Sequence, residues 1–378
     1  MGSKRVIVTA ARHGCSRVPV RVSADALGGK GAVALKDRAT GLVSPTQIMD
    51  ESGRRSICWI LEPLGKGESR DYEVVPGVGG AGVELVDFPG DRVEFHVGGG
   101  LFTAYRYGGE LARPFLHPVI GPEGKCVTRG YPMVEGVPGE TTDHFHHRGI
   151  WVAFGDVNGV DDWSEDPGHG KIVHREFVEK TSGPVFARIR VLNDWTAPDG
   201  GKIIEEERTI TVYNTPDTRR LMDLSVVFRA TRGDVSFGDT KEGGIIAVRV
   251  ATTMDGERGG TITNSYGGVS EAETWGKPAH WCDYSGAVDG GIVGISVFDT
   301  PGNFRYPTYW HVRDYGLFTA NPFALSAYFN DPSRDGSFVL ESGGVLSFSY
   351  RVYIHDGDAA AARVAEEYHS YINPPQPG

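Results

Sequence analysis

The sequence contains no long apolar segment. Nowhere in its 378 residues does a stretch approach the ~20 apolar residues of a membrane-spanning helix. The opening residues, MGSKRVIVTAARHG, also lack the apolar run of a signal peptide. We therefore expect a cytoplasmic protein that has no membrane partner.

Cysteine and clustered positive charge are also scarce. The four cysteines include no CxxC pair, which excludes a zinc knuckle or a thioredoxin-type motif and fits reduced thiols. The formal net charge is -11 and no run of Lys or Arg occurs, so a nucleic-acid partner is not expected.

Glycine and proline, by contrast, are abundant and scattered through the chain. The 53 glycines and 22 prolines suit many tight turns between short strands. Apolar residues alternate with mostly polar ones over 222–228 and over 346–354, which is the period of antiparallel sheets that bury one face. These patterns predict a mainly β protein built as a large antiparallel β-sandwich.

The pattern also suggests how the chain is divided. We expect a small N-terminal β domain over residues 1–75, a Gly-rich linker over 76–82 and a large sandwich domain over 83–378. A C-terminal helix is expected over 359–368, capped by Asp356 or Asp358.

Three of the twelve histidines fall within four positions of the segment Asp143-His144-Phe145-His146-His147-Arg148. If the chain is already extended at Asp143, His144 and His146 share one face and His147 lies on the other. Imidazoles at this spacing can exchange protons, bind one metal ion or bind sugar hydroxyls. Arg148 adds a permanent charge for a carboxylate or a developing oxyanion. The segment is therefore predicted to be the centre of an active or binding site.

Other segments add candidate binding residues. Residues 155–163 form a polar, turn-prone loop ending in an indole, which suits a saccharide, although an Asn-Gly turn with a packed Trp explains it equally well. A turn at 241–244 offers an acid–base pair, and residues 307–316 are too polar and aromatic for a core strand. The candidates from these and neighbouring segments are Asn158, Asp161, Trp163, Lys241, Glu242, Trp281, His311, Arg313, Tyr315 and Asn321.

Taken together, these segments resemble a bacterial family labelled PmoA-like, or methane oxygenase. The matching text, within residues 106–372, comprises 113–122, 128–132, 143–149, 156–161, 309–316 and 321–323. The methane oxygenase label does not suit this chain, because a membrane-bound subunit of that kind needs transmembrane helices. The family also usually has Asp-Phe-Trp where this chain has Asp161-Asp162-Trp163.

The resemblance implies a role in carbohydrate metabolism. The alternating sheets also look like the galactose-mutarotase supersandwich, a fold that hosts mutarotases, epimerases, glycosidases and lyases, so it does not settle the function.

The first hypothesis is a carbohydrate-active hydrolase, lyase or epimerase that acts on a small sugar, an oxidised sugar or an oligosaccharide and requires no cofactor. His144 or His146 is then the general acid, and Glu242 or His311 the base. Arg148 or Arg313 stabilises negative charge, and the rings of Trp163 and Tyr315 hold the sugar. His147, Asn158, Asp161, Lys241, Trp281 and Asn321 complete the binding set.

Two alternatives stay open. The site could hold a divalent metal ion on His144, His146 and His311, with Asp143 or Glu242 as a further ligand. The chain could also be a carbohydrate-binding protein that performs no reaction.

Overall fold

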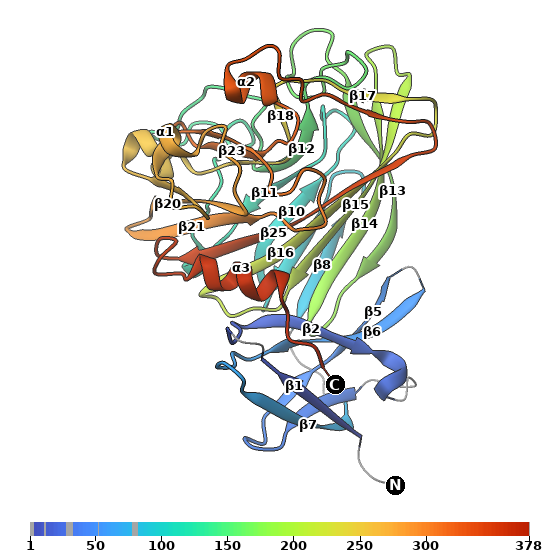
Figure 1. The fold of residues 1–378 in the computed structure, drawn as a ribbon, viewed down its shortest axis with the longest axis vertical. Coiled ribbons are helices and arrows are strands. Elements are labelled where there is room, and N and C mark those ends of the chain that lie inside the picture. The colour runs from blue at the N-terminus through green and yellow to red at the C-terminus, as the bar shows by residue number, and fades with distance from the viewer. Residues whose placement is uncertain (1–3, 11–12, 28–32, 52, 78–81, 378) are drawn as a thin grey trace.

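The computed structural model describes residues 4–10, 13–27, 33–51, 53–77 and 82–377. Two eight-stranded antiparallel sheets form the two layers of a sandwich, and smaller sheets adjoin it (Figure 1). The prediction of a mainly β protein with a large antiparallel sandwich is therefore confirmed.

The chain passes several times between the two large sheets. In spatial order the first sheet comprises β22 (Trp310–Arg313), β23 (Leu317–Ala320), β18 (Gly243–Arg249), β12 (Ile150–Phe154), β11 (Phe115–Val119), β10 (Gly100–Arg106), β9 (Arg92–Val97) and β8 (Val83–Phe88). The second comprises β13 (Lys171–Thr181), β14 (Phe186–Thr196), β15 (Lys202–Tyr213), β16 (Arg219–Arg229), β25 (Val345–Asp356), β21 (Gly291–Phe298), β20 (Trp281–Val288) and β19 (Thr261–Asn264). A separate pair joins β17 (Val235–Phe237) and β24 (Phe338–Leu340).

The two alternating runs seen in the sequence are neighbours in space. They form β16 and β25, and their register places Leu224 opposite Tyr350 and Val226 opposite Phe348. Successive side chains of a strand point to opposite faces, so both strands present their apolar residues to the same side. That shared face is one wall of the core.

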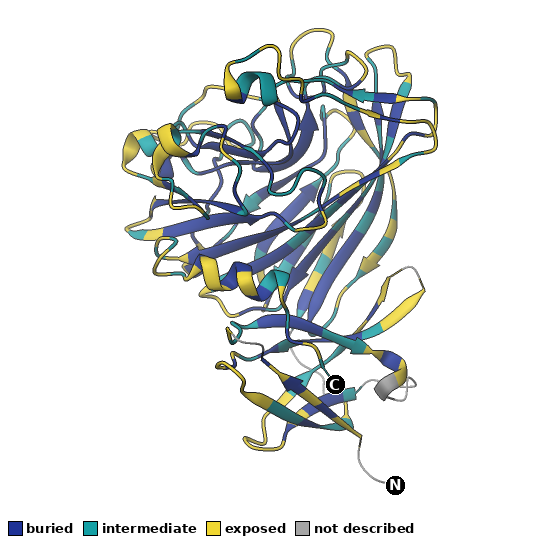
Figure 2. Cartoon of the chain, in the orientation of Figure 1, coloured by how far each residue is buried: buried dark blue, intermediate teal, exposed yellow. Residues whose placement is uncertain are grey.

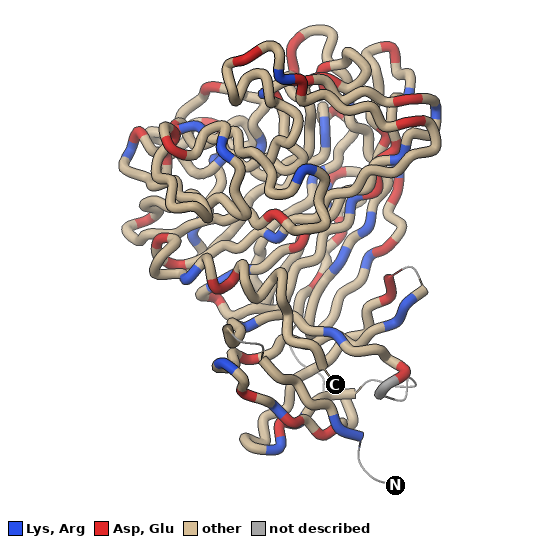
Figure 3. Tube along the Cα trace, viewed as in Figure 1, with Lys and Arg blue, Asp and Glu red and all other residues tan. Residues whose placement is uncertain are grey.

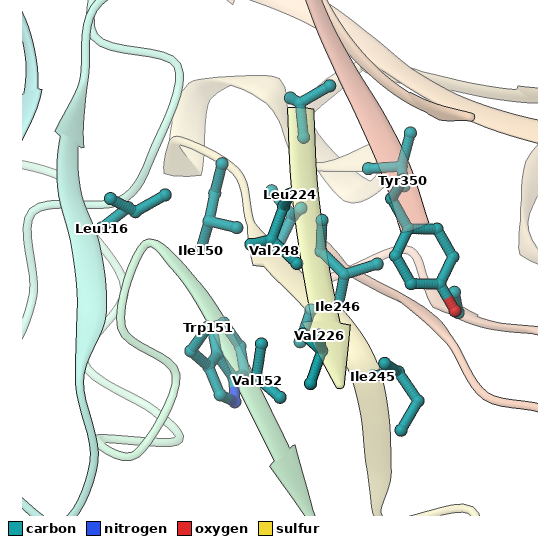
Figure 4. Close-up of a cluster of buried hydrophobic side chains, with 14 of the residues drawn as sticks. Leu116, Ile150, Trp151, Val152, Leu224, Val226, Ile245, Ile246, Val248 and Tyr350 are labelled. Carbon is teal, nitrogen blue, oxygen red and sulfur yellow. The ribbon is translucent and has the colours of Figure 1, made fainter. Parts of the chain in front are cut away.

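The core lies between the two large sheets. Ile150 and Val152 of β12 and Val248 of β18 lie in one cluster with Leu224 and other residues of the second sheet (Figure 4). In Figure 2 much of the length of the strands in both layers is dark blue, and the exposed residues lie mainly in loops, in helices and on outer strands. Each such side chain contributes roughly 1.5–3 kcal/mol when it leaves water.

The N-terminal residues form two sheets of their own below the sandwich (Figure 1). In spatial order the first of these sheets comprises β1 (Arg5–Thr9), β7 (Ser69–Pro76), β3 (Val33–Asp37) and β4 (Val43–Pro45). The second comprises β2 (Val18–Ser23), β6 (Arg54–Leu61) and β5 (Gln47–Glu51). Their apolar side chains surround Trp59 and Tyr72. The predicted linker falls largely on residues 78–81, which lie outside the described residues, and the division into two domains stays a prediction.

The N-terminal sheets pack on the sandwich through a shared apolar cluster. Met49 of β5 and Cys58 of β6 are buried with Phe186 and Tyr213 of the second large sheet. The side-chain oxygen of Gln47 also accepts hydrogen bonds from the backbone of Val185 and Phe186, at 3.1 and 3.0 Å.

Helices are short. They are α1 (Ser270–Thr274), α2 (Leu325–Phe329), α3 (Val364–Ile372) and the 3-10 turns Ala24–Leu27, Pro122–Gly124, Thr252–Met254 and Gly256–Arg258. In the described part of the chain, no helix has the length and apolar character needed to cross a membrane.

The C-terminal helix begins later than the sequence predicts. Asp358 accepts hydrogen bonds from the backbone of Ala360 and Ala361, but these close a turn and not a helix. Arg363 then adopts φ 55°, a left-handed conformation that interrupts a right-handed helix, so α3 starts at the next residue.

Candidate functional site

A cavity of about 320 Å³ collects residues from separate parts of the sequence. Its lining residues are His144, His147, Lys241, Glu242, Glu271, His311, Arg313 and Tyr315. Neighbouring strands of the first large sheet bring them together: β22, β23, β18 and β12 are consecutive in that sheet. His311 and Arg313 stand two positions apart on β22 and so share a face.

The histidine segment is a turn and not a strand, which corrects the expected alternation. β12 begins only at Ile150, and the backbone N–H of His147 donates to the carbonyl of His144 at 2.9 Å. His144 itself adopts φ 44°, a strained conformation for a residue with a side chain. The turn places His144 and His147, in place of His144 and His146, against the cavity.

Two buried arginines anchor this turn. Asp143 accepts hydrogen bonds from Arg129 at 2.7 Å and from Arg249 at 2.9 Å, and Arg129 also donates to the carbonyl of His144 at 2.9 Å. Burial opposes the charged form of Asp143, but Arg249, the hydrogen bond from His144 and Arg129 outweigh it and lower the pKa of Asp143 to about 2. Asp143 therefore stays ionised and fixes the conformation of the turn.

The rings of His144, His147 and Tyr315 lie nearly parallel. His144 is stacked on His147 and on Tyr315, with ring centroids 4.8 Å apart in both pairs. His147 in turn is stacked on Trp151 of β12 at 5.3 Å, so the turn folds back over that face of the sheet. The guanidinium of Arg249 lies 4.9 Å from the centre of the Tyr315 ring.

Hydrogen bonds define the protonation of two cavity histidines. Arg249 can only donate, so Nδ1 of His147, 3.2 Å away, is an acceptor and the proton lies on Nε2. In His311, Nδ1 donates to the carbonyl of Lys241 at 2.7 Å and Nε2 accepts from Arg313 at 3.2 Å. Burial lowers the pKa of both imidazoles, with the neighbouring charges of Arg249 and Arg313 adding to the effect, so both are neutral.

Two ion pairs complete the lining of the cavity. Lys241 is paired with Glu242 on the turn before β18, and Arg313 donates to Glu271 of α1 at 2.7 Å. Burial raises the pKa of Glu242, but the hydrogen bond and charge of Lys241 prevail and lower it below the usual value, so Glu242 is ionised at neutral pH. Burial also raises the pKa of Tyr315 to about 12, which keeps its hydroxyl protonated.

Several predicted site residues do not line this cavity, and their part in a site stays a prediction. His146 packs edge-on against His147 at 4.4 Å but does not line the cavity. Arg148 makes a bidentate ion pair with Glu165, at 3.0 and 2.8 Å, and its charge is therefore already paired. Trp163 is buried in the core beside Trp151, and Trp281 belongs to the cluster beneath the N-terminal sheets.

The other three predicted site residues that do not line the cavity form hydrogen bonds that support turns. Asn158 exchanges hydrogen bonds with the backbone of Ser236 and Asp234, as expected for a turn residue. Asp161 accepts from the backbone of Trp163 and Ser164. Asn321 is fully buried and donates to the carbonyl of Thr240 at 3.0 Å, so it positions the Lys241–Glu242 turn without reaching the ligand space.

Among the residues of the alternative metal site, His311 does not fit as a ligand in this arrangement. Both nitrogens of His311 are engaged, one as a donor, and a ligand needs a free lone pair. Within the residues that the structure describes, no three His, Cys, Asp or Glu side chains are grouped to hold a metal ion.

Sequence reasoning missed Glu271, Arg129 and Arg249. A charged residue at the end of the apolar run 245–250 was a usable signal for Arg249, because an arginine in such a run needs a buried partner. Glu271 gave no signal, since nothing local connects it with Arg313.

Comparison with known proteins places the chain in a family without an assigned activity. No curated protein matches the sequence. A family model described as a family of unknown function (DUF6807) matches residues 92–369, which include every residue that lines the cavity. The match covers well over half of the chain, and the protein therefore belongs to this family of unknown function, DUF6807.

Proposed function

We propose that this chain is a carbohydrate-active enzyme, a hydrolase, lyase or epimerase, that uses His144 and Glu242 for acid–base chemistry. The observation that carries the proposal is the shared cavity. His144, Glu242 and His311 are far apart in the sequence and all line it. A cavity in which titratable groups from distant parts of the sequence converge is a candidate active site.

The hydrogen bonds suggest a role for each group. The Nδ1–H of His144 donates to Asp143, which leaves Nε2 to exchange a proton with a ligand. Glu242, being ionised, is suited to accept a proton. Tyr315, which lines the cavity, can donate a hydrogen bond to a sugar oxygen.

His311 takes a different role from the one its sequence suggested. Its two nitrogens are occupied by Lys241 and Arg313, so it is a positioning residue that joins the two ion pairs of the wall. The general base is accordingly Glu242 and not His311.

Further features support the proposal without testing it. The segments 143–149 and 309–316, which carry the resemblance to the PmoA-like family, both contribute lining residues. The proposal includes a fold like the galactose-mutarotase supersandwich and a cytoplasmic location. It also includes a sugar or oligosaccharide ligand and a reaction that requires no cofactor. The four cysteines are free, as a reducing compartment would leave them.

The test is conversion of a panel of mono- and disaccharides by the wild type, His144→Ala and Glu242→Ala. Loss of one proton-transfer group is expected to lower kcat by at least ~100-fold. Ligand affinity measured by calorimetry should change much less. Glu366→Ala, on exposed α3, is the matched control and should keep full activity.

The alternative of a non-catalytic binding protein makes the opposite prediction. The panel would then contain sugars that bind and none that is converted, and the two substitutions would affect affinity alone.

A further inference from the structure

Every charged side chain that lines the cavity lies beside an opposite charge. Lys241 is paired with Glu242, and Arg313 is paired with Glu271. The cavity therefore presents two compensated pairs and, among its described lining residues, no unpaired cation.

Behind the cavity, two buried arginines share one carboxylate, and hydrogen bonds hold both in place. The neutral imidazoles of His147 and His311 add no charge. Arg129 and Arg249 are fully buried, do not line the cavity and share the carboxylate of Asp143. Neither is free to turn toward a ligand without leaving Asp143.

The size and rings of the cavity suit one small polar ring. Its volume of about 320 Å³ falls at the lower end of the ~300–1,000 Å³ range of ligand pockets. The stacked rings of Tyr315 and His144 are partly exposed, and their exposed edges can contact the C–H side of a sugar. Carboxylates and guanidiniums can each bind two adjacent hydroxyl groups.

We propose that the ligand is an uncharged sugar, with one ring in this cavity, and that the site discriminates against uronic acids and sugar phosphates. The proposal rests on the carbohydrate function proposed above and narrows it. An added anion would have to share Arg313 with Glu271 or Lys241 with Glu242, and the carboxylate already paired there would repel it. Basic and acidic residues are also interspersed along the chain (Figure 3), so at a net charge of -11 the long-range field does not attract anions.

The test compares matched ligands by calorimetry at pH 7 on the full-length protein. The probes are methyl glycosides of neutral hexoses and the corresponding methyl uronides, which differ only in a carboxylate in place of CH₂OH. The neutral member of the pair that binds best should bind at least ~tenfold more tightly than its uronide, a difference of about 1.4 kcal/mol.

Two variants test whether the paired charges cause the preference for the neutral ligand. Glu271→Gln leaves Arg313 unpaired and should reduce or invert the preference for the neutral ligand. Glu242→Gln leaves Lys241 unpaired and should have the same effect on the preference. It replaces the first variant if Glu271→Gln does not fold. Glu366→Gln removes an exposed carboxylate on α3 and should leave the preference unchanged.

The outcomes separate this inference from the proposed function. A wild type that binds the uronide as well as, or better than, the neutral sugar overturns the inference and leaves a carbohydrate enzyme. A folded Glu271→Gln or Glu242→Gln variant with an unchanged preference also overturns it. If no sugar of either class binds or is converted, the proposed function fails, and the inference fails with it.

Discussion

Asp143 is the residue on which the geometry of the site depends most. It is the shared acceptor for Arg129 and Arg249 and holds His144 by its ring nitrogen. Both arginine side chains are wholly buried, so the carboxylate compensates charge that water cannot reach.

Asp143→Asn is therefore expected to destabilise the fold as well as the site. We expect the free energy of unfolding to fall by about 2 kcal/mol, less than the 3–5 kcal/mol of a fully buried pair, because Asp143 is partly exposed. Urea denaturation checks this. Asp331→Asn, in an exposed pair with Arg334, is the control and should cost below ~0.5 kcal/mol; equal effects would contradict the account.

The buried side chain of Asp162 makes the free energy of unfolding depend on pH. Burial raises its pKa to about 8 despite the nearby charge of Arg113, and neither side-chain oxygen has a hydrogen-bond partner in the described structure. The unfolded chain releases this proton near pH 4 and the folded chain only near pH 8, so the folded state binds the extra proton between them. Stability contributed by this group is present below pH 4 and is lost as pH rises toward 8.

Asp162→Asn removes this titration. The variant should gain stability relative to the wild type as pH rises from 5 to 7, by up to ~1.4 kcal/mol per pH unit. Chemical denaturation of both proteins at the two pH values measures the change. A difference between them that does not grow with pH would show that Asp162 is ionised in the folded protein.

At the scale of elements, the start of β12 determines where the histidine turn lies. Gly149 has φ 58°, and a Cβ atom there would lie 2.1 Å from the carbonyl oxygen of Leu116 on β11. Only glycine lets the two strands approach at this point, directly after His147 and Arg148.

Gly149→Ala should separate β11 from β12 and move the turn. We expect a loss of unfolding free energy of about 2–3 kcal/mol, together with lower affinity for any ligand of the cavity. Gly159→Ala is the matched control, because Gly159 has φ 78° but open space around its Cβ position, and should cost only ~1 kcal/mol. Similar losses of stability in the two variants would refute the close-approach argument.

At the scale of the whole molecule, the N-terminal sheets and the sandwich share one apolar cluster. Met49 of β5 is buried with Phe186 and Tyr213 of the second large sheet. This contact predicts that the two parts stabilise each other.

Met49→Ala should lower the unfolding free energy by about 2–4 kcal/mol, since it leaves a cavity in that interface. Ile48, its exposed neighbour on the same strand, provides the control, and Ile48→Ala should cost less than ~1 kcal/mol. Thermal unfolding followed by circular dichroism distinguishes them; an unaffected Met49→Ala protein would mean that the interface contributes little.

How far the sequence could predict this molecule depended on how local each feature is. The strands β16 and β25 were predictable because a side-chain period of two is visible in a few consecutive residues. The turn at 144–147 was not, because it depends on Arg249, which lies 106 positions from Asp143. For the same reason the sequence did not show that Arg148 is paired with Glu165, or that His147 and not His146 lines the cavity.

The most direct test of the account is a crystal structure of Glu242→Gln with a neutral methyl hexoside, since this variant should bind without turning over. The account predicts one sugar ring in the 320 Å³ cavity, within hydrogen-bond distance of His144 Nε2 and residue 242 and in contact with Tyr315. A sugar bound only elsewhere, for example in the cavity of about 820 Å³ between α3 and the N-terminal sheets, would contradict it.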